Sequence, residues 1–204
     1  MITERIKISN DGTGMKNALG LAEALAVSLG LSKKESFHLR LLAEEMFSMV
    51  RAIAGNFSAN FWIEEEKRLC RLHLEASKMD LDYGKRRELL SVSTEGKNTA
   101  RRGIMEKVRE VVEAGLYAVA EGYNIQAEYG IGMFNYGAMG IQDTVMSETL
   151  YAWSMQKYKS EIESRPDESE AWDEIEKSII ANIADDVRVG VRKDSLEILV
   201  QKKF

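Results

Sequence analysis

Two kinds of hydrophobic spacing follow one another along the chain, and each predicts a different element. Near the N-terminus Ile6 and Ile8 alternate with polar residues, which is the period-two pattern of a strand with one buried face. Apolar residues then recur every three or four positions through residues 15–30 and again through residues 33–54. The spacing predicts a strand at residues 3–9 and two amphipathic helices after it.

The period-two pattern returns in four later segments, which form two hairpins with turn-forming residues between their members. These segments are residues 59–65, 68–76, 186–192 and 195–202, and a helical pattern at 171–184 precedes the last two. Because every strand alternates and none is a continuous apolar run, one face of the sheet should be buried and the other polar. We therefore expect a two-layer α/β sandwich of the α+β class, with a mixed or antiparallel sheet and helices on one face.

The middle of the chain has a different composition. Residues 115–158 contain six of the 15 glycines, six of the seven tyrosines and four of the ten methionines. We expect residues 115–169 to be a Gly/Tyr/Met-rich insertion with a helix at about 144–164, while residues 1–114 and 170–204 form the domain itself. Tyr and Met are favoured at interfaces, so the insertion is either a contact with a partner or a second copy, or a cover for the domain's own core.

Charge and cysteine content exclude several classes of protein. The chain has 28 Lys and Arg against 33 Asp and Glu, a net charge of −5, so no positive excess attracts nucleic acid. Cys70 is alone and only His38 and His73 are present, too few for a disulfide or a structural zinc site. No apolar run approaches the ~18 residues of a membrane helix. We expect a cytoplasmic protein with no metal site that binds neither nucleic acid nor membrane.

A pair of adjacent acids lies in the second predicted helix, where residues 41–55 read LLAEEMFSMVRAIAG. The signatures of zinc proteases, serine hydrolases and P-loop ATPases are absent. This helix resembles the N box of the GHKL-type, or histidine-kinase-like, ATPase domains, and the predicted order of elements resembles theirs as well. The closest resemblance is to the bacterial anti-sigma-factor serine kinases. The resemblance covers roughly residues 1–105 and 170–204.

In that family a helical Glu is followed four residues later by a magnesium-binding Asn. The resemblance places Glu45 at the catalytic Glu position, but the partner position is Met49, whose thioether does not suit Mg²⁺. Shifting the register by one residue gives Glu44 and Ser48, with a hydroxyl that could coordinate weakly. The alternative interpretation of both acids is an ordinary solvated helix face.

The family's next motif, Asp-x-Gly-x-Gly, binds the adenine amino group and allows close backbone approach. Two registers compete for it: Glu75, which ends a predicted strand, and Asp80 with Gly84, which has the family spacing but carries Asp82 in place of the first glycine. Either way a glycine is missing. A turn with a helix cap at Asp80 or Asp82 is the alternative.

A lid over the triphosphate follows in the family, and residues 93–103, STEGKNTARRG, resemble it. The resemblance implies Lys97, with Arg101 or Arg102, as phosphate partners, with Asn98 and Gly103 beside them. The family's Gly-x-Gly is absent from this stretch. An exposed basic loop between helices is the competing interpretation.

The resemblance implies an ATP-binding regulatory protein of bacteria that acts through a protein partner of the sigma-factor or anti-sigma-antagonist type. ATP or ADP would be the cofactor, and Met49 leaves a role for Mg²⁺ open. The same departures predict weak or absent ATPase and kinase activity. The alternative function is a non-catalytic protein-interaction module whose nucleotide pocket has decayed, and a homodimer is compatible with either function.

Overall fold

The computed structural model of the chain describes residues 1–54, 56–77, 151–164, 178–192 and 195–204, with the helical positions 108, 112, 172, 175 and 176. Predictions that concern the other residues lie outside this part of the chain.

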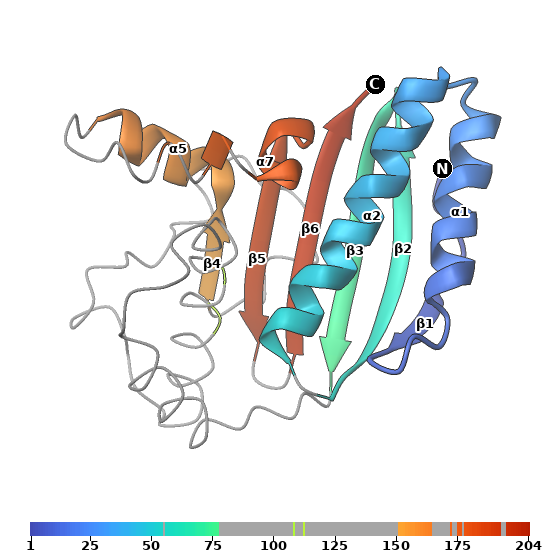
Figure 1. Ribbon diagram of the computed structural model, residues 1–204, viewed down its shortest axis with the longest axis horizontal. Helices are drawn as coiled ribbons and strands as arrows, with labels where there is room; N and C mark the ends of the chain where they lie inside the picture. Colours follow the sequence, from blue (N-terminus) through green and yellow to red (C-terminus); the bar gives the residue numbers. More distant parts are fainter. Residues whose placement is uncertain are drawn as a thin grey trace.

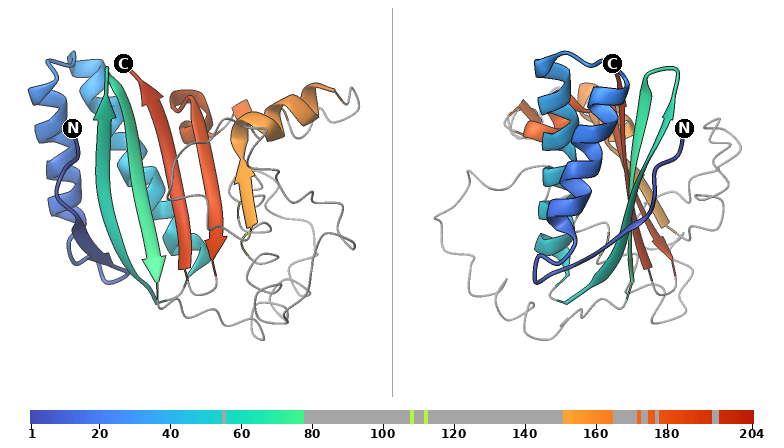
Figure 2. Two further views of the ribbon diagram at one scale, coloured as in Figure 1. Left: turned by 180° about the vertical axis from the view of Figure 1, so that it is seen from behind. Right: turned by 90° about the vertical axis from the view of Figure 1, so that its right-hand side faces the viewer.

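Six strands form one antiparallel sheet in the order β1-β2-β3-β6-β5-β4 (Figure 1). The strands are β1 (Ile6–Ser9), β2 (Ser58–Glu66), β3 (Leu69–Ser77), β4 (Tyr151–Ser154), β5 (Asp186–Arg192) and β6 (Ser195–Lys203). The helices are α1 (Met15–Ser28), α2 (Lys33–Ile53), α5 (Met155–Glu163) and α7 (Ile179–Ile183). In Figure 2, α1, α2 and α7 cover one face of the sheet. The described part of the chain is therefore a two-layer α+β sandwich, as the alternating strands predicted.

Of the mixed and antiparallel sheets that were both expected, the described strands form an antiparallel one, so the mixed alternative is wrong for them. Two details of the predicted helices need correction. The helix expected from residue 144 is preceded by β4, because Tyr151–Ser154 pairs with β5 as an edge strand and α5 begins only at Met155. The last predicted helix is interrupted at Ser178, whose side chain accepts a hydrogen bond from the amide of Ala181 and starts α7 as a separate turn.

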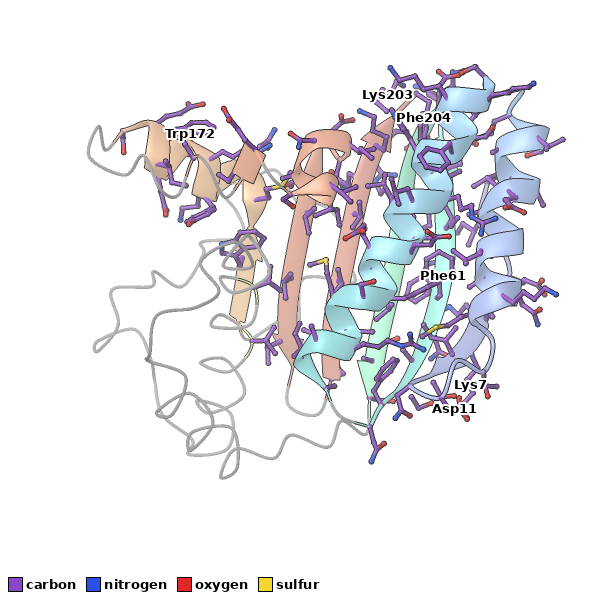
Figure 3. All side chains as sticks on the ribbon, viewed as in Figure 1. Lys7, Asp11, Phe61, Trp172, Lys203 and Phe204 are labelled. Carbon is purple, nitrogen blue, oxygen red and sulfur yellow. The ribbon has the colours of Figure 1, made fainter. Side chains whose placement is uncertain are left out.

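Helix α2 is the longest element and lies diagonally across the sheet (Figure 1). Ser32 and Glu35 form a reciprocal capping box that fixes its first turn. Its buried residues recur at helical spacing and form one stripe; they are Leu39, Leu42, Ala43, Met46, Phe47, Met49, Val50 and Ile53. This stripe packs on the inner face of the sheet, the face that carries Phe61 of β2, labelled in Figure 3. The rings of Phe47 and Phe61 meet edge to face, with their centroids 5.2 Å apart.

The connection from β1 to α1 requires glycine at one position. Gly14 begins the helix at φ 78°, and a Cβ there would lie 2.0 Å from the carbonyl oxygen of Lys7. Asp11 closes the same turn, accepting hydrogen bonds from Ser9 Oγ at 2.6 Å and the Thr13 amide at 2.8 Å. These bonds lower the pKa of the Asp11 carboxyl to about 2. The turn holds the start of α1 against the edge of the sheet.

The opposite face of the sheet is polar but well ordered. Trp62 and His73 stack in parallel at 4.7 Å, and the guanidinium carbon of Arg5 lies 4.2 Å from the centre of the Trp62 ring. Glu64 joins this cluster, with its Oε2 3.6 Å from His73 Nε2. Stacking across β2 and β3 therefore stabilises a face that has no described helix upon it.

A buried carboxylate attaches α5 to the sheet. Asp186, at the start of β5, accepts hydrogen bonds from Ser154 Oγ, from the Gln156 amide at the first turn of α5, and from Arg188 Nε at 2.8 Å. Lys159 of α5 also donates to the carbonyl oxygen of Ala181 in the middle of α7. Edge strand β4 and helix α5 are thereby fixed to β5 by polar contacts as well as by packing.

The single thiol is a structural group. Cys70 is fully buried in the same core cluster as Met46 and Leu72, as the alternation of β3 predicted, and burial raises its pKa to about 11. We expect iodoacetamide to label Cys70 slowly in the native protein and fast in urea, as followed by intact mass. Equal rates in the two conditions would contradict a buried thiol.

The role of Asp186 gives a second prediction. Asp186→Ala leaves several donors without their shared acceptor, so the free energy of unfolding in urea should fall by on the order of 2 to 3 kcal/mol. Asp186→Asn keeps one acceptor oxygen and should lose clearly less. A loss for Asp186→Ala no larger than that for Glu163→Ala, at an exposed position of α5, would contradict this role.

Candidate functional site

The two adjacent acids of α2 lie in different surroundings. Glu45 is partly buried and precedes the fully buried Met49 by one helical turn. Glu44 lies toward α1, where the Arg40 guanidinium contacts both Glu44 and Glu23. One acid therefore lies at the edge of the buried stripe, and the other belongs to the helix–helix surface.

Glu44 and Ser48, the pair of the alternative register, both make contacts within the helix layer. Glu44 Oε1 accepts a hydrogen bond from Arg40 Nε at 2.9 Å, and the Ser48 hydroxyl donates to the Glu44 carbonyl oxygen at 3.0 Å. Ser48 is exposed. These two residues therefore support the α1–α2 packing, which is the ordinary helix-face interpretation of the pair.

Glu45 makes no comparable contact with the described residues. In the described residues its carboxylate forms no hydrogen bond or ion pair, and its pKa is raised, mainly by burial and secondarily by the charge of Glu44. A carboxylate that loses hydration without gaining a partner lowers stability at neutral pH. Such a group at the edge of a core is a candidate functional residue, because perturbed carboxyl groups concentrate at sites of binding and catalysis.

Magnesium does not fit the residues present around Glu45. The side chain one turn later is the thioether of Met49, a soft donor that Mg²⁺ avoids, and it is buried in the core. Within the described ranges no group of three His, Cys, Asp or Glu residues could hold a metal ion. The described side chains around Glu45 therefore do not suit a bound magnesium ion.

The sheet separates Glu75 from Glu45. Leu74 and Ala76 of β3 belong to the core beneath the helices, and strand alternation directs Glu75 to the opposite face. There it lies between Asn60 of β2 and Glu197 of β6 in the strand register. A single ligand on the helix-covered face could therefore reach Glu45 but not Glu75.

The other predicted site residues lie outside the described part of the chain. They are Asp80, Asp82, Gly84, Lys97, Asn98, Arg101, Arg102 and Gly103. Their roles as adenine and phosphate contacts therefore stay predictions.

Sequence reasoning did not single out the polar cluster of the outer face. Trp62 and His73, 2% and 1% exposed, are in register on β2 and β3, and the buried Glu197 lies on neighbouring β6. The sequence did contain one signal: Trp62 and His73 occupy outer-face positions of their strands, and a large aromatic ring is unusual on a face that was expected to be solvated. Asp186, which attaches α5, gave no comparable signal because the partners through which it does so, Ser154 and the Gln156 amide, lie some 30 residues away.

Comparisons of the chain with models of known protein families, with characterised proteins and with solved structures found no match. The described helices include none that is both long enough and apolar enough to cross a membrane.

The environment of Glu45 predicts a pH-dependent stability. Because folding raises its pKa, the native state binds more protons than the unfolded state between the two pKa values, so stability falls as pH rises through that window. Glu45→Gln should therefore be more stable than the parent at about pH 7, and this difference should vanish below the unfolded pKa of Glu, about 4.3.

Urea unfolding at a series of pH values measures this difference. Glu163→Gln, at an exposed position of α5, is the matched control and should follow the parent at every pH. A Glu45→Gln protein that is less stable than the parent at neutral pH would show that the carboxylate has a stabilising partner.

Proposed function

We propose that this chain is a nucleotide-binding regulatory domain of the GHKL type that acts through a protein partner and has little or no phosphotransfer activity. The observation that carries the proposal is the partly buried carboxylate of Glu45, which has no partner among the described residues and lies on the helix that resembles the N box, toward the edge of its buried stripe. Retaining such a group lowers stability, so a ligand-related role accounts for it better than packing does.

The order of elements gives supporting context. A strand, two helices and a hairpin are followed, after the central segment, by edge strand β4, helices α5 and α7, and a terminal hairpin, with all these strands in one sheet beneath α2. Apart from β4 and α5, this order is what the resemblance to the anti-sigma-factor serine kinases implies. It supports nucleotide binding on the helix-covered side, next to α2.

The expectation of weak catalysis rests on the donors around Glu45. Met49 offers no hard oxygen, and Ser48, the residue of the other register, is exposed and bonded to the backbone of its own helix. Without a metal ligand beside the acid, the charge that develops during phosphoryl transfer has no cation held by this helix to stabilise it.

The second candidate function is a protein-interaction module that no longer binds nucleotide. Two observations favour it: Met49 fills core space, and Glu44 contacts Arg40 within the α1–α2 layer. In this case the fold would be maintained by packing alone, and Glu45 would be a remnant.

A thermal-shift titration separates these functions. ATP and ADP should each raise the melting temperature with equal effect in the presence and absence of Mg²⁺, because a ligand that binds the native state stabilises it by about 2.7 kcal/mol at a hundred times its Kd. No shift with either nucleotide would favour the interaction module.

Turnover is measured on the same samples by phosphate release. We expect no release above background from the parent. Magnesium-dependent release that Glu45→Gln abolishes and Glu163→Gln retains would contradict the proposed lack of activity.

A further inference from the structure

The two most exposed large apolar side chains of the described helices lie near the α1–α2 connection. Val27 at the end of α1 is 80% exposed and Phe37 in the second turn of α2 is 60% exposed. The helices run antiparallel, and the contact between Glu23 and Arg40 fixes their relative register. Val27 is one turn beyond Glu23 and Phe37 is one turn before Arg40, so the two apolar side chains lie on neighbouring helix surfaces at the same end of the helix layer.

Two lysines flank this apolar pair. Lys33 and Lys34 occupy the first two positions of α2, four and three residues before Phe37, and therefore share its side of the helix. Both are exposed, and neither forms an ion pair with a described residue. Glu35, the acid of this turn, is already engaged, since its carboxylate accepts from the Ser32 amide at 2.7 Å and lies 3.7 Å from Arg68.

This placement of lysines is unfavourable for the helix itself. The amino end of a helix carries the positive end of the macrodipole, so cations in the first turn destabilise it and acids stabilise it. Lys33 and Lys34 lie at that end of α2, and the exposed Phe37 beside them gains nothing from burial. A binding role explains why these three residue types are found together.

We propose that Val27, Phe37, Lys33 and Lys34 form a docking surface, here called the corner surface, for an acidic amphipathic segment of a protein partner. The occupant follows from charge complementarity: apolar anchors would cover Val27 and Phe37 while carboxylates pair with the two lysines. A lipid surface fits less well, because the chain has a net charge of −5 and the patch has only two large apolar side chains. The inference rests on the proposed action through a partner, but it does not require nucleotide binding.

The test uses the full chain and a fluorescein-labelled synthetic peptide. The peptide has about 18 residues, with leucines at helical spacing on one face and glutamates on the other. Fluorescence anisotropy should show saturable binding that weakens with added salt. A peptide of the same composition in scrambled order should bind at least about tenfold more weakly, a difference of about 1.4 kcal/mol.

Variants locate the binding to the corner surface. Phe37→Ser and the double variant Lys33→Glu/Lys34→Glu should each weaken peptide binding at least about tenfold. Ile179→Ser, at another exposed apolar position, and Lys16→Glu, in the first turn of α1, are matched controls and should change it less than about twofold.

The melting temperatures distinguish a binding surface from a structural one. The double lysine variant should melt higher than the parent, because acids suit the start of α2, even though it loses the peptide. Lys16→Glu should likewise melt no lower than the parent while keeping the peptide. Loss of folding in Phe37→Ser would contradict the exposed position of that side chain.

Any one of three results would overturn the corner surface. The first is equal affinity for the ordered and scrambled peptides, and the second is an equal loss of peptide affinity in Phe37→Ser and Ile179→Ser. The third is Phe37-dependent sedimentation with phosphatidylserine vesicles in the absence of peptide binding. The response of Phe37→Ser to ATP should match that of the parent. Failure of nucleotide binding and failure of the corner surface are therefore observed separately.

Discussion

Burial of one stripe of α2 on one face of an antiparallel sheet is the constraint on which the rest of the described structure depends. Every described strand except β4 contributes core residues that are fully buried or nearly so, and α2 supplies eight buried side chains above them. The small residues Ala18, Ala22 and Ala26 let α1 pack closely into the same layer. Once this stripe is buried, side chains flanking it are fixed too: Glu45 at its edge, and Phe37 and the first-turn lysines on the exposed side.

The two faces of the sheet have different energetics. The inner face is stabilised because its apolar side chains are removed from water. A core of this kind tolerates little change in side-chain volume. The outer face uses directional contacts, such as the Trp62–His73 stack and the bonds to Asp186, whose strength depends on geometry and charge. Glu45 fits neither pattern, since it is partly buried without a described partner.

The repeating patterns predicted most of the fold because each needs only local sequence. Alternation in β2, β3, β5 and β6 and the three-to-four spacing of α2 follow directly from which face must be buried. Strand β4 was missed because four residues cannot show a period before Met155 begins a helix. For the candidate site, the sequence indicated Glu45, and Leu74 beside Glu75 already implied that Glu75 faces away. Contacts of Asp186 could not be predicted, because they join residues distant along the chain whose proximity only the sheet order determines.

The proposed function depends on a nucleotide that binds beside α2, next to the partly buried Glu45. Hydrogen–deuterium exchange measured by mass spectrometry, with and without saturating ATP, tests it most directly, because ligand binding slows the opening of the segments it contacts. The account predicts slower exchange in peptides that contain residues 41–53 of α2, with no change in peptides from residues 155–163 of α5. Unchanged exchange in α2, or protection confined to α5, would contradict it.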